Sequence, residues 1–290
     1  MKKPGCSKKS EDQEPKKIKN QKNQKKEGEK RKRATERKQE MAVDIDYIMD
    51  LLDIQRRPNE QTRGLEYASH VRSINVFLQP RDSRHNQNVW TNCARVLAAR
   101  SDRELGPYFS RLFEWLRDRN SPGADIIYHR LLNSFCEEMI AAYQCCLNIA
   151  EKCGDEIWQG NLTEFGTEYI LDLLDKENEP IRQIRGRQLA RSVKDLKVFL
   201  QPLDKKHNKN VWTNCARVVS DRSDEELAPY LVQILEWLQD MDWPGAECIQ
   251  DRLNRYTKTP TLRCAFTVCI RRARETRNPV WEENLIMLQL

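Results

Sequence analysis

The residues best suited to chemistry are two histidines, each set among acidic and amide side chains. A histidine beside a carboxylate can act as a general base, because its ordinary pKa lies close to neutrality. Each group follows a proline and precedes a helix start, where Asp and Asn side chains serve as caps. We therefore expect a structural role first, a small polar-recognition site second and catalysis last. The candidate residues are Asp82, His85, Asn86, Asp204, His207 and Asn208, with Asn88, Asn92, Asn210 and Asn214 in the helices that follow.

Both groups belong to a stretch that the chain contains twice. Residues 76–108 and 198–230 are identical at 24 of 33 positions, at a constant offset of 122. Such self-similarity indicates an internal duplication, with about 120 residues in each copy. We expect copy one over residues 41–160 and copy two over residues 161–290, after a disordered basic tail over residues 1–40.

The elements that position these stretches have the apolar spacing of helices throughout. No alternating strand pattern longer than chance occurs. Ser101 with Glu104, and Ser223 with Glu226, predict capping boxes that open helices closing near Arg119 and Met241. A further helix is predicted to start at once after each closure, at Pro122 and Pro244. We predict an all-α fold, a tandem duplication of a HEAT-like helical repeat domain, with two separate helical bundles as the alternative.

Residues 236–246 read EWLQDMDWPGA. This segment resembles a small helical family of mostly bacterial proteins, known only as a domain of unknown function and marked by E-W-L-Q-D-x-N-W-P. Residues 202–208 are similar to the family's P-x-x-K-H-D segment, with one residue more and Asn208 in place of the Asp. Residues 114–122 of copy one resemble the signature less closely, with Ser121 in place of the second Trp. The resemblance implies two HEAT-like copies and transfers no catalytic residue.

The charge of the chain is concentrated at its start. Residues 1–40 hold 16 Lys and Arg against 7 Asp and Glu, a balance of +9, whereas the remainder holds 34 against 37, a balance of −3. Few apolar side chains accompany this charge, which is typical of disorder. A nucleic acid could bind residues 1–40 through salt-sensitive attraction, or the tail could be a solubilising extension. Translation from Met41 would remove it altogether.

Several classes of protein do not fit the sequence. It contains no apolar run long enough to span a membrane and no signal peptide, so a cytoplasmic location and reduced cysteines are expected. It has no C-x-x-C pair, phosphate-binding loop or dinucleotide fingerprint. We therefore expect neither an enzyme nor a bound metal or cofactor.

Trp243 has no counterpart in copy one, where Ser121 stands. Beside Pro244 it either staples a turn or serves as a binding anchor. The predicted function is a non-enzymatic helical-repeat module that binds another protein. The alternatives are a nucleic-acid-associated protein anchored by residues 1–40, and a small-ligand or catalytic site at the His85 and His207 loops.

Overall fold

The computed structural model describes residues 44–79, 87–201 and 209–288. Regular structure in these ranges is entirely helical, with no strand among them, which confirms the all-α class. None of the helices described there combines the length and apolar character needed to cross a membrane. Most of the predicted site residues lie outside the described residues, namely Asp82, His85, Asn86, Asp204, His207 and Asn208.

The chain divides into two compact units by its internal contacts. The first extends to Leu105 and includes Asn120–Ile127, and the second comprises Gly106–Arg119 and Tyr128–Leu290. The expected copy boundary at 160/161 falls inside one continuous helix, α9 (Glu156–Leu173). The boundaries between the two compact units therefore differ from the expected boundary between the two sequence copies.

The first unit is built from short helices. Asp44 caps the first of them through hydrogen bonds from the backbone N–H groups of Asp46 and Tyr47. Its α-helices and 3-10 helices (η) are α2 (Ile45–Leu51), α3 (Pro58–Ser69), η1 (Ile74–Phe77), η2 (Gln87–Val89), α4 (Trp90–Ala98) and α5 (Asp102–Leu105).

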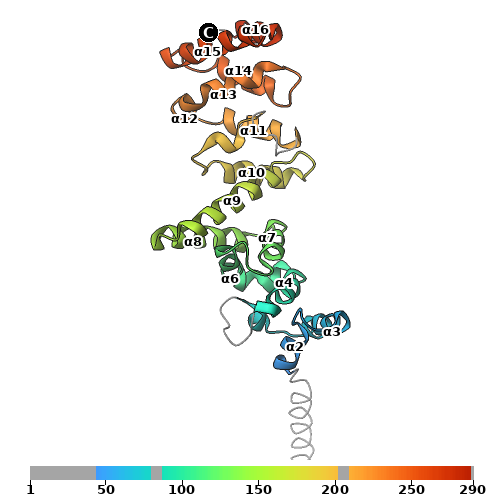
Figure 1. Ribbon diagram of the computed structural model, residues 1–290. Helices are drawn as coiled ribbons and strands as arrows, with labels where there is room; N and C mark the ends of the chain where they lie inside the picture. Colours follow the sequence, from blue (N-terminus) through green and yellow to red (C-terminus); the bar gives the residue numbers. More distant parts are fainter. Residues whose placement is uncertain (1–43, 80–86, 202–208, 289–290) are drawn as a thin grey trace, which may run out of the picture. The chain divides into compact units, whose positions relative to one another are not determined.

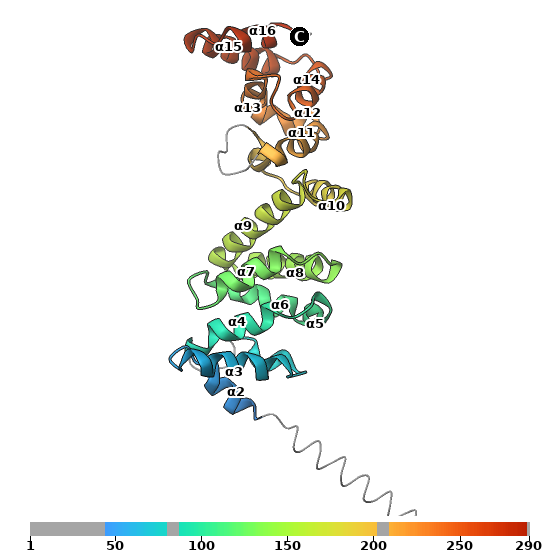
Figure 2. The same ribbon diagram turned by 90° about the vertical axis from the view of Figure 1, so that its right-hand side faces the viewer.

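The second unit contains the whole of copy two. From α8 to α16 its helices follow one another in chain order (Figure 1), with α9 leading from α8 to α10 (Figure 2). The bounds are η3 (Gly106–Tyr108), α6 (Phe109–Phe113), η4 (Glu114–Arg117), α8 (Glu137–Cys153), α9, α10 (Pro180–Ala190), η5 (Leu196–Phe199), η6 (Lys209–Val211), α11 (Trp212–Ser220), α12 (Asp224–Leu227), η7 (Ala228–Tyr230), α13 (Leu231–Glu236), η8 (Trp237–Gln239), α14 (Ala246–Asn254), α15 (Pro260–Glu275) and α16 (Pro279–Ile286). Helix α7 (Ala124–Leu132) crosses the division between the units.

The helix predicted after each capping box is broken rather than continuous. In copy two it becomes α12, η7, α13 and η8 in succession, and copy one repeats this pattern from α5 to η4. Pro107 and Pro229 lie in the 3-10 turns. A proline ring lacks the N–H for an α-helical bond and clashes with the preceding turn, so the helix tightens there.

The helix predicted at Pro244 begins two residues later, at Ala246. Gly245 precedes it with a φ of 88°, a left-handed conformation that glycine adopts without steric cost. The backbone N–H of Ala246 donates to the carbonyl of Trp243 at 3.0 Å and closes the turn. Proline thus belongs to a turn before the helix rather than to its first turn.

A matched pair of glycines brings the first helices of each copy together. A Cβ atom at Gly64 would lie 2.9 Å from Leu51 Cβ, and one at Gly186 would lie 2.9 Å from Leu173 Cβ. Only glycine allows α3 to approach α2, and α10 to approach α9, this closely. The same packing device therefore recurs at the offset of 122.

Candidate functional site

Asn92 and Asn214, the buried members of the predicted polar groups, act as clamps between helices. Asn214 Nδ2 donates to the carbonyl of Leu174 at 2.7 Å and to Gln183 Oε1 at 2.9 Å. Asn92 Nδ2 donates to the carbonyl of Leu52 at 2.8 Å and to Gln61 Oε1 at 2.9 Å. Each amide thereby satisfies a carbonyl at the end of a preceding helix. These contacts fit the structural role expected for this part of the polar groups.

Gln79 and Gln201 are the most unusual polar residues of the two copies. They precede the histidine-containing segments, and their exposed fractions are 1% and 0%. Neither side-chain amide has a hydrogen-bond partner for its oxygen or its nitrogen in the described structure. A buried amide without a partner costs about 1–3 kcal/mol. Neither residue is among the predicted site residues, although both copies have glutamine at this position.

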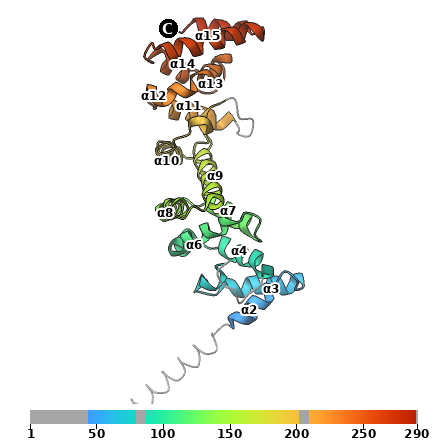
Figure 3. The same ribbon diagram turned by 60° about the vertical axis from the view of Figure 1, so that its left-hand side comes forward.

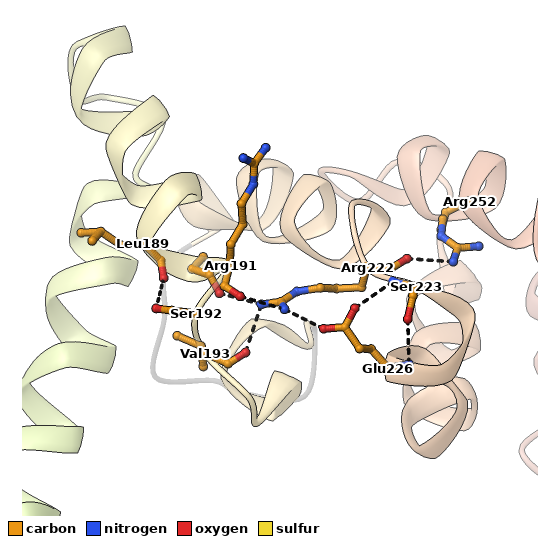
Figure 4. A network of polar contacts seen from close by, with 9 residues as sticks. Leu189, Arg191, Ser192, Val193, Arg222, Ser223, Glu226 and Arg252 are labelled. Atoms are coloured by element: carbon orange, nitrogen blue, oxygen red, sulfur yellow. Dashed lines mark hydrogen bonds and ion pairs between the residues drawn. The ribbon is translucent and has the colours of Figure 1, made fainter. Parts of the chain in front are cut away.

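An arginine network ties successive helices together in copy two (Figure 4). Arg222 Nη2 donates to the carbonyls of Ala190 at 2.6 Å and Val193 at 3.0 Å, at the end of α10. Its Nη1 donates to the carbonyl of Arg191 at 3.1 Å and to Glu226 Oε1 at 2.8 Å. The guanidinium therefore donates to carbonyls at the C-terminal end of α10, among them that of Ala190, which also accepts the backbone N–H of Val193.

Copy one repeats the centre of this network. Arg100 Nη2 donates to the carbonyls of Ala68 at 2.8 Å and Val71 at 3.0 Å, and its Nη1 donates to Glu104 Oε1 at 3.1 Å. Both predicted capping boxes are confirmed, since Ser101 and Ser223 exchange hydrogen bonds with Glu104 and Glu226. These arginines and glutamates therefore have a structural role in each copy.

Asp224 extends the network in copy two. It accepts hydrogen bonds from Arg252 Nη2 at 2.6 Å and from the backbone N–H of Thr257 at 2.9 Å. Desolvation acts to raise the pKa of Asp224, but the hydrogen bonds from Thr257 and Arg252 outweigh it and lower the pKa. The carboxylate therefore remains ionised and ties α12 to the connection between α14 and α15.

Trp243 lies against the core of copy two rather than away from it. Its ring meets Trp212 edge to face, with the centroids 5.8 Å apart, and it is partly buried. The indole N–H of Trp237 donates to the carbonyl of Pro244 at 3.3 Å and holds the same turn. This geometry fits the stapling role, while the role of Trp243 as a binding anchor stays a prediction.

The buried thiols are poor nucleophiles. Burial raises the pKa of Cys93, Cys215 and Cys269 to about 12, and that of Cys146 to about 11. The thiolate is the reactive form of cysteine, so these side chains pack as small apolar groups. Within the described ranges, no three His, Cys, Asp or Glu side chains gather as a metal ion would require.

One strongly charged segment was not among the predicted features. Residues 251–277 hold eight Lys and Arg against two Asp and Glu, a balance of +6. The matching residues of copy one, 128–154, hold two against three, a balance of −1. The net charge of the whole folded part conceals this difference in charge between the two copies. A window of helix length compared between the copies would have found it.

The fold is all-α over the described ranges, and the polar contacts described above join successive helices. Residues 200–288 match a family described as a domain of unknown function (DUF5071). Residues 202–208 and 236–246, which carry the predicted resemblance in copy two, fall within this match, whereas residues 114–122 of copy one lie outside it. The match supports a helical family of unknown function for this part of copy two. Neither a curated protein nor a solved structure matches the chain.

Proposed function

We propose that this chain is a non-enzymatic, cytoplasmic helical-repeat module whose folded part binds another protein. The observation that carries the proposal is that the two copies keep their inward contacts and differ on their outward surfaces. A repeat protein recognises partners in this way, because its core fixes the helices while its surface residues vary.

The inward contacts agree closely between α8–α9 and α15–α16. The indole N–H of Trp158 donates to the carbonyl of Phe113 at 3.0 Å, and that of Trp281 donates to the carbonyl of Leu235 at 3.1 Å. The matched amides Asn161 and Asn284 donate to the carbonyls of Leu116 and Leu238 at 2.7 and 2.9 Å. Paired helices with repeated internal contacts support the proposal of tandem HEAT-like repeats.

Affinity capture from nuclease-treated lysate tests the proposal. Residues 1–290 and residues 41–290 serve as paired baits, and bound proteins are identified by mass spectrometry. We expect one discrete protein on both baits, and its binding is then reproduced with purified components. Retention by residues 1–290 alone, lost at high salt, would contradict the proposal and favour a nucleic acid bound through residues 1–40.

A small-ligand site is the second candidate function, favoured by the unpartnered amides of Gln79 and Gln201. A polar ligand that supplied one donor and one acceptor would remove the cost of burying each amide. A thermal-shift screen of small polar compounds on the unaltered chain and on Gln201→Met tests this function. A compound that stabilises only the unaltered chain supports it, and compounds that act equally on both contradict it.

A further inference from the structure

The outward face of α15 carries a row of arginines. Arg263, Arg271 and Arg274 follow a spacing of i, i+8 and i+11, which places them on one side of the helix. The buried residues of α15 lie on its other side, namely Leu262, Ala265, Cys269 and Ala273. The side chains of Arg271 and Arg274 are 72% and 65% exposed. The row, which we name the α15 basic face, is therefore open to solvent in this structure.

Intramolecular ion pairs neutralise little of this charge. Arg271 lies 3.8 Å from Glu275 and Arg274 lies 2.7 Å from Glu282, and exposed pairs of this kind contribute little free energy. Arg263 forms no ion pair with any described residue, and the same holds for Lys258, which precedes α15. A partner carboxylate could therefore engage these cations at low cost.

The fold of the repeat does not require these arginines. Ile140, Asn148 and Glu151 occupy the matching positions of α8, at the offset of 123 that relates Trp158 to Trp281. Ile140 is only 7% exposed, whereas Arg263 is exposed. The last helix pair of a repeat stack needs a polar outer face, but mixed charges would satisfy that need. The excess of positive over negative charge on α15 therefore indicates recognition.

The chemistry around the α15 basic face favours a protein over a nucleic acid. Helix α16 packs on α15 (Figure 1), and α15 also packs on α13 (Figure 3). Val280 and Ile286 of α16 and its C-cap residue Met287 are 56%, 63% and 65% exposed. A phosphate backbone offers no surface for such aliphatic side chains. Base stacking needs exposed aromatic rings, but Tyr256 and Trp281 are buried, and Phe266 of α15 is partly buried against the core.

We propose that α15, together with the exposed apolar side chains of α16, binds an acidic segment of a protein partner that carries aliphatic side chains. Guanidinium groups bind carboxylates in a bidentate manner, and the aliphatic residues add burial of apolar surface. This proposal rests on the proposed function and assigns the surface and the partner chemistry to it.

The test uses residues 1–290 and a fluorescent amphipathic peptide of Glu and Leu, titrated by anisotropy. The triple variant R263E/R271E/R274E reverses the α15 basic face. The triple variant K152E/K176E/K194E makes the same change in net charge at exposed lysines elsewhere. We expect the first to weaken peptide binding about tenfold or more, and the second to change it by less than about twofold. Melting temperatures and R263Q/R271Q/R274Q control for folding.

Equal weakening by both reversals would overturn the proposal, because net charge alone would then explain binding. Single-stranded RNA that binds through the α15 basic face more tightly than the peptide would also overturn it. If a protein captured by the folded part binds the R263E/R271E/R274E variant unchanged, this inference fails while the proposed function stands.

Discussion

Asn214→Ala should destabilise copy two by about 2–4 kcal/mol. The side chain is 1% exposed, and its amide makes hydrogen bonds to Leu174, Gln183 and Arg217 at 2.7, 2.9 and 3.2 Å. Each bond contributes about 1 kcal/mol net, and an acceptor left buried without a donor costs about 1–3 kcal/mol. The carbonyl of Leu174 would become such an acceptor at the end of α9. Urea titration followed by circular dichroism measures the loss.

Two further variants test the cause of the loss. Asn214→Asp keeps the shape but places a carboxylate against two oxygens, so it should destabilise at least as much as alanine does. Asn92→Ala removes matching bonds of 2.8, 2.9 and 2.9 Å from copy one, so its cost should agree within about 1 kcal/mol. A loss below about 0.5 kcal/mol for Asn214→Ala would refute the clamp.

Three further predictions concern other residues of copy two. Gln201→Met should raise the free energy of unfolding by about 1–2 kcal/mol in urea titrations, because two buried atoms without partners disappear; a loss would show that the amide is satisfied. Trp243→Leu should lower the melting temperature and cost about 1–2 kcal/mol through loss of the Trp212 contact, and no change would contradict stapling. Hydrogen bonds from the Ser223 backbone and Arg222 lower the pKa of Glu226 from its ordinary 4.5. The stability that ionised Glu226 gives to the folded state is therefore fully present above its ordinary pKa. This stability is lost as the pH falls through the lower pKa of the folded state. Glu226→Gln should flatten the fall of melting temperature with acid, and an unchanged slope would count against this carboxylate.

Local sequence signals predicted the local structure well. The capping boxes at Ser101 and Ser223 are confirmed, because a cap depends on residues three positions apart. The broken helices at Pro107 and Pro229 were missed, although proline gave a local signal. Apolar spacing continues smoothly through such a break, since a 3-10 turn shifts the register only slightly.

Features that depend on tertiary contacts lay beyond the reach of the sequence. The burial of Gln79 and Gln201 without partners depends on which elements cover them, and glutamine in a sequence usually indicates an exposed position. Helix α9 likewise continues across the expected copy boundary at 160/161, which the comparison of the two copies did not predict. The α15 basic face was readable from charge, but only after the two copies were compared helix by helix.

Site-specific photo-crosslinking tests the central claim most directly. Cys264 is exposed on α15 next to Arg263, and Cys145 is exposed on α8. A benzophenone is attached at Cys264 after Cys6, Cys145 and Cys153 are changed to serine, and at Cys145 in a matched variant that lacks Cys6, Cys153 and Cys264. We predict that the Glu–Leu peptide, and any protein captured by the folded part, crosslinks from Cys264 and not from Cys145. Crosslinking from Cys145 alone, or equally from both positions, would contradict docking on α15.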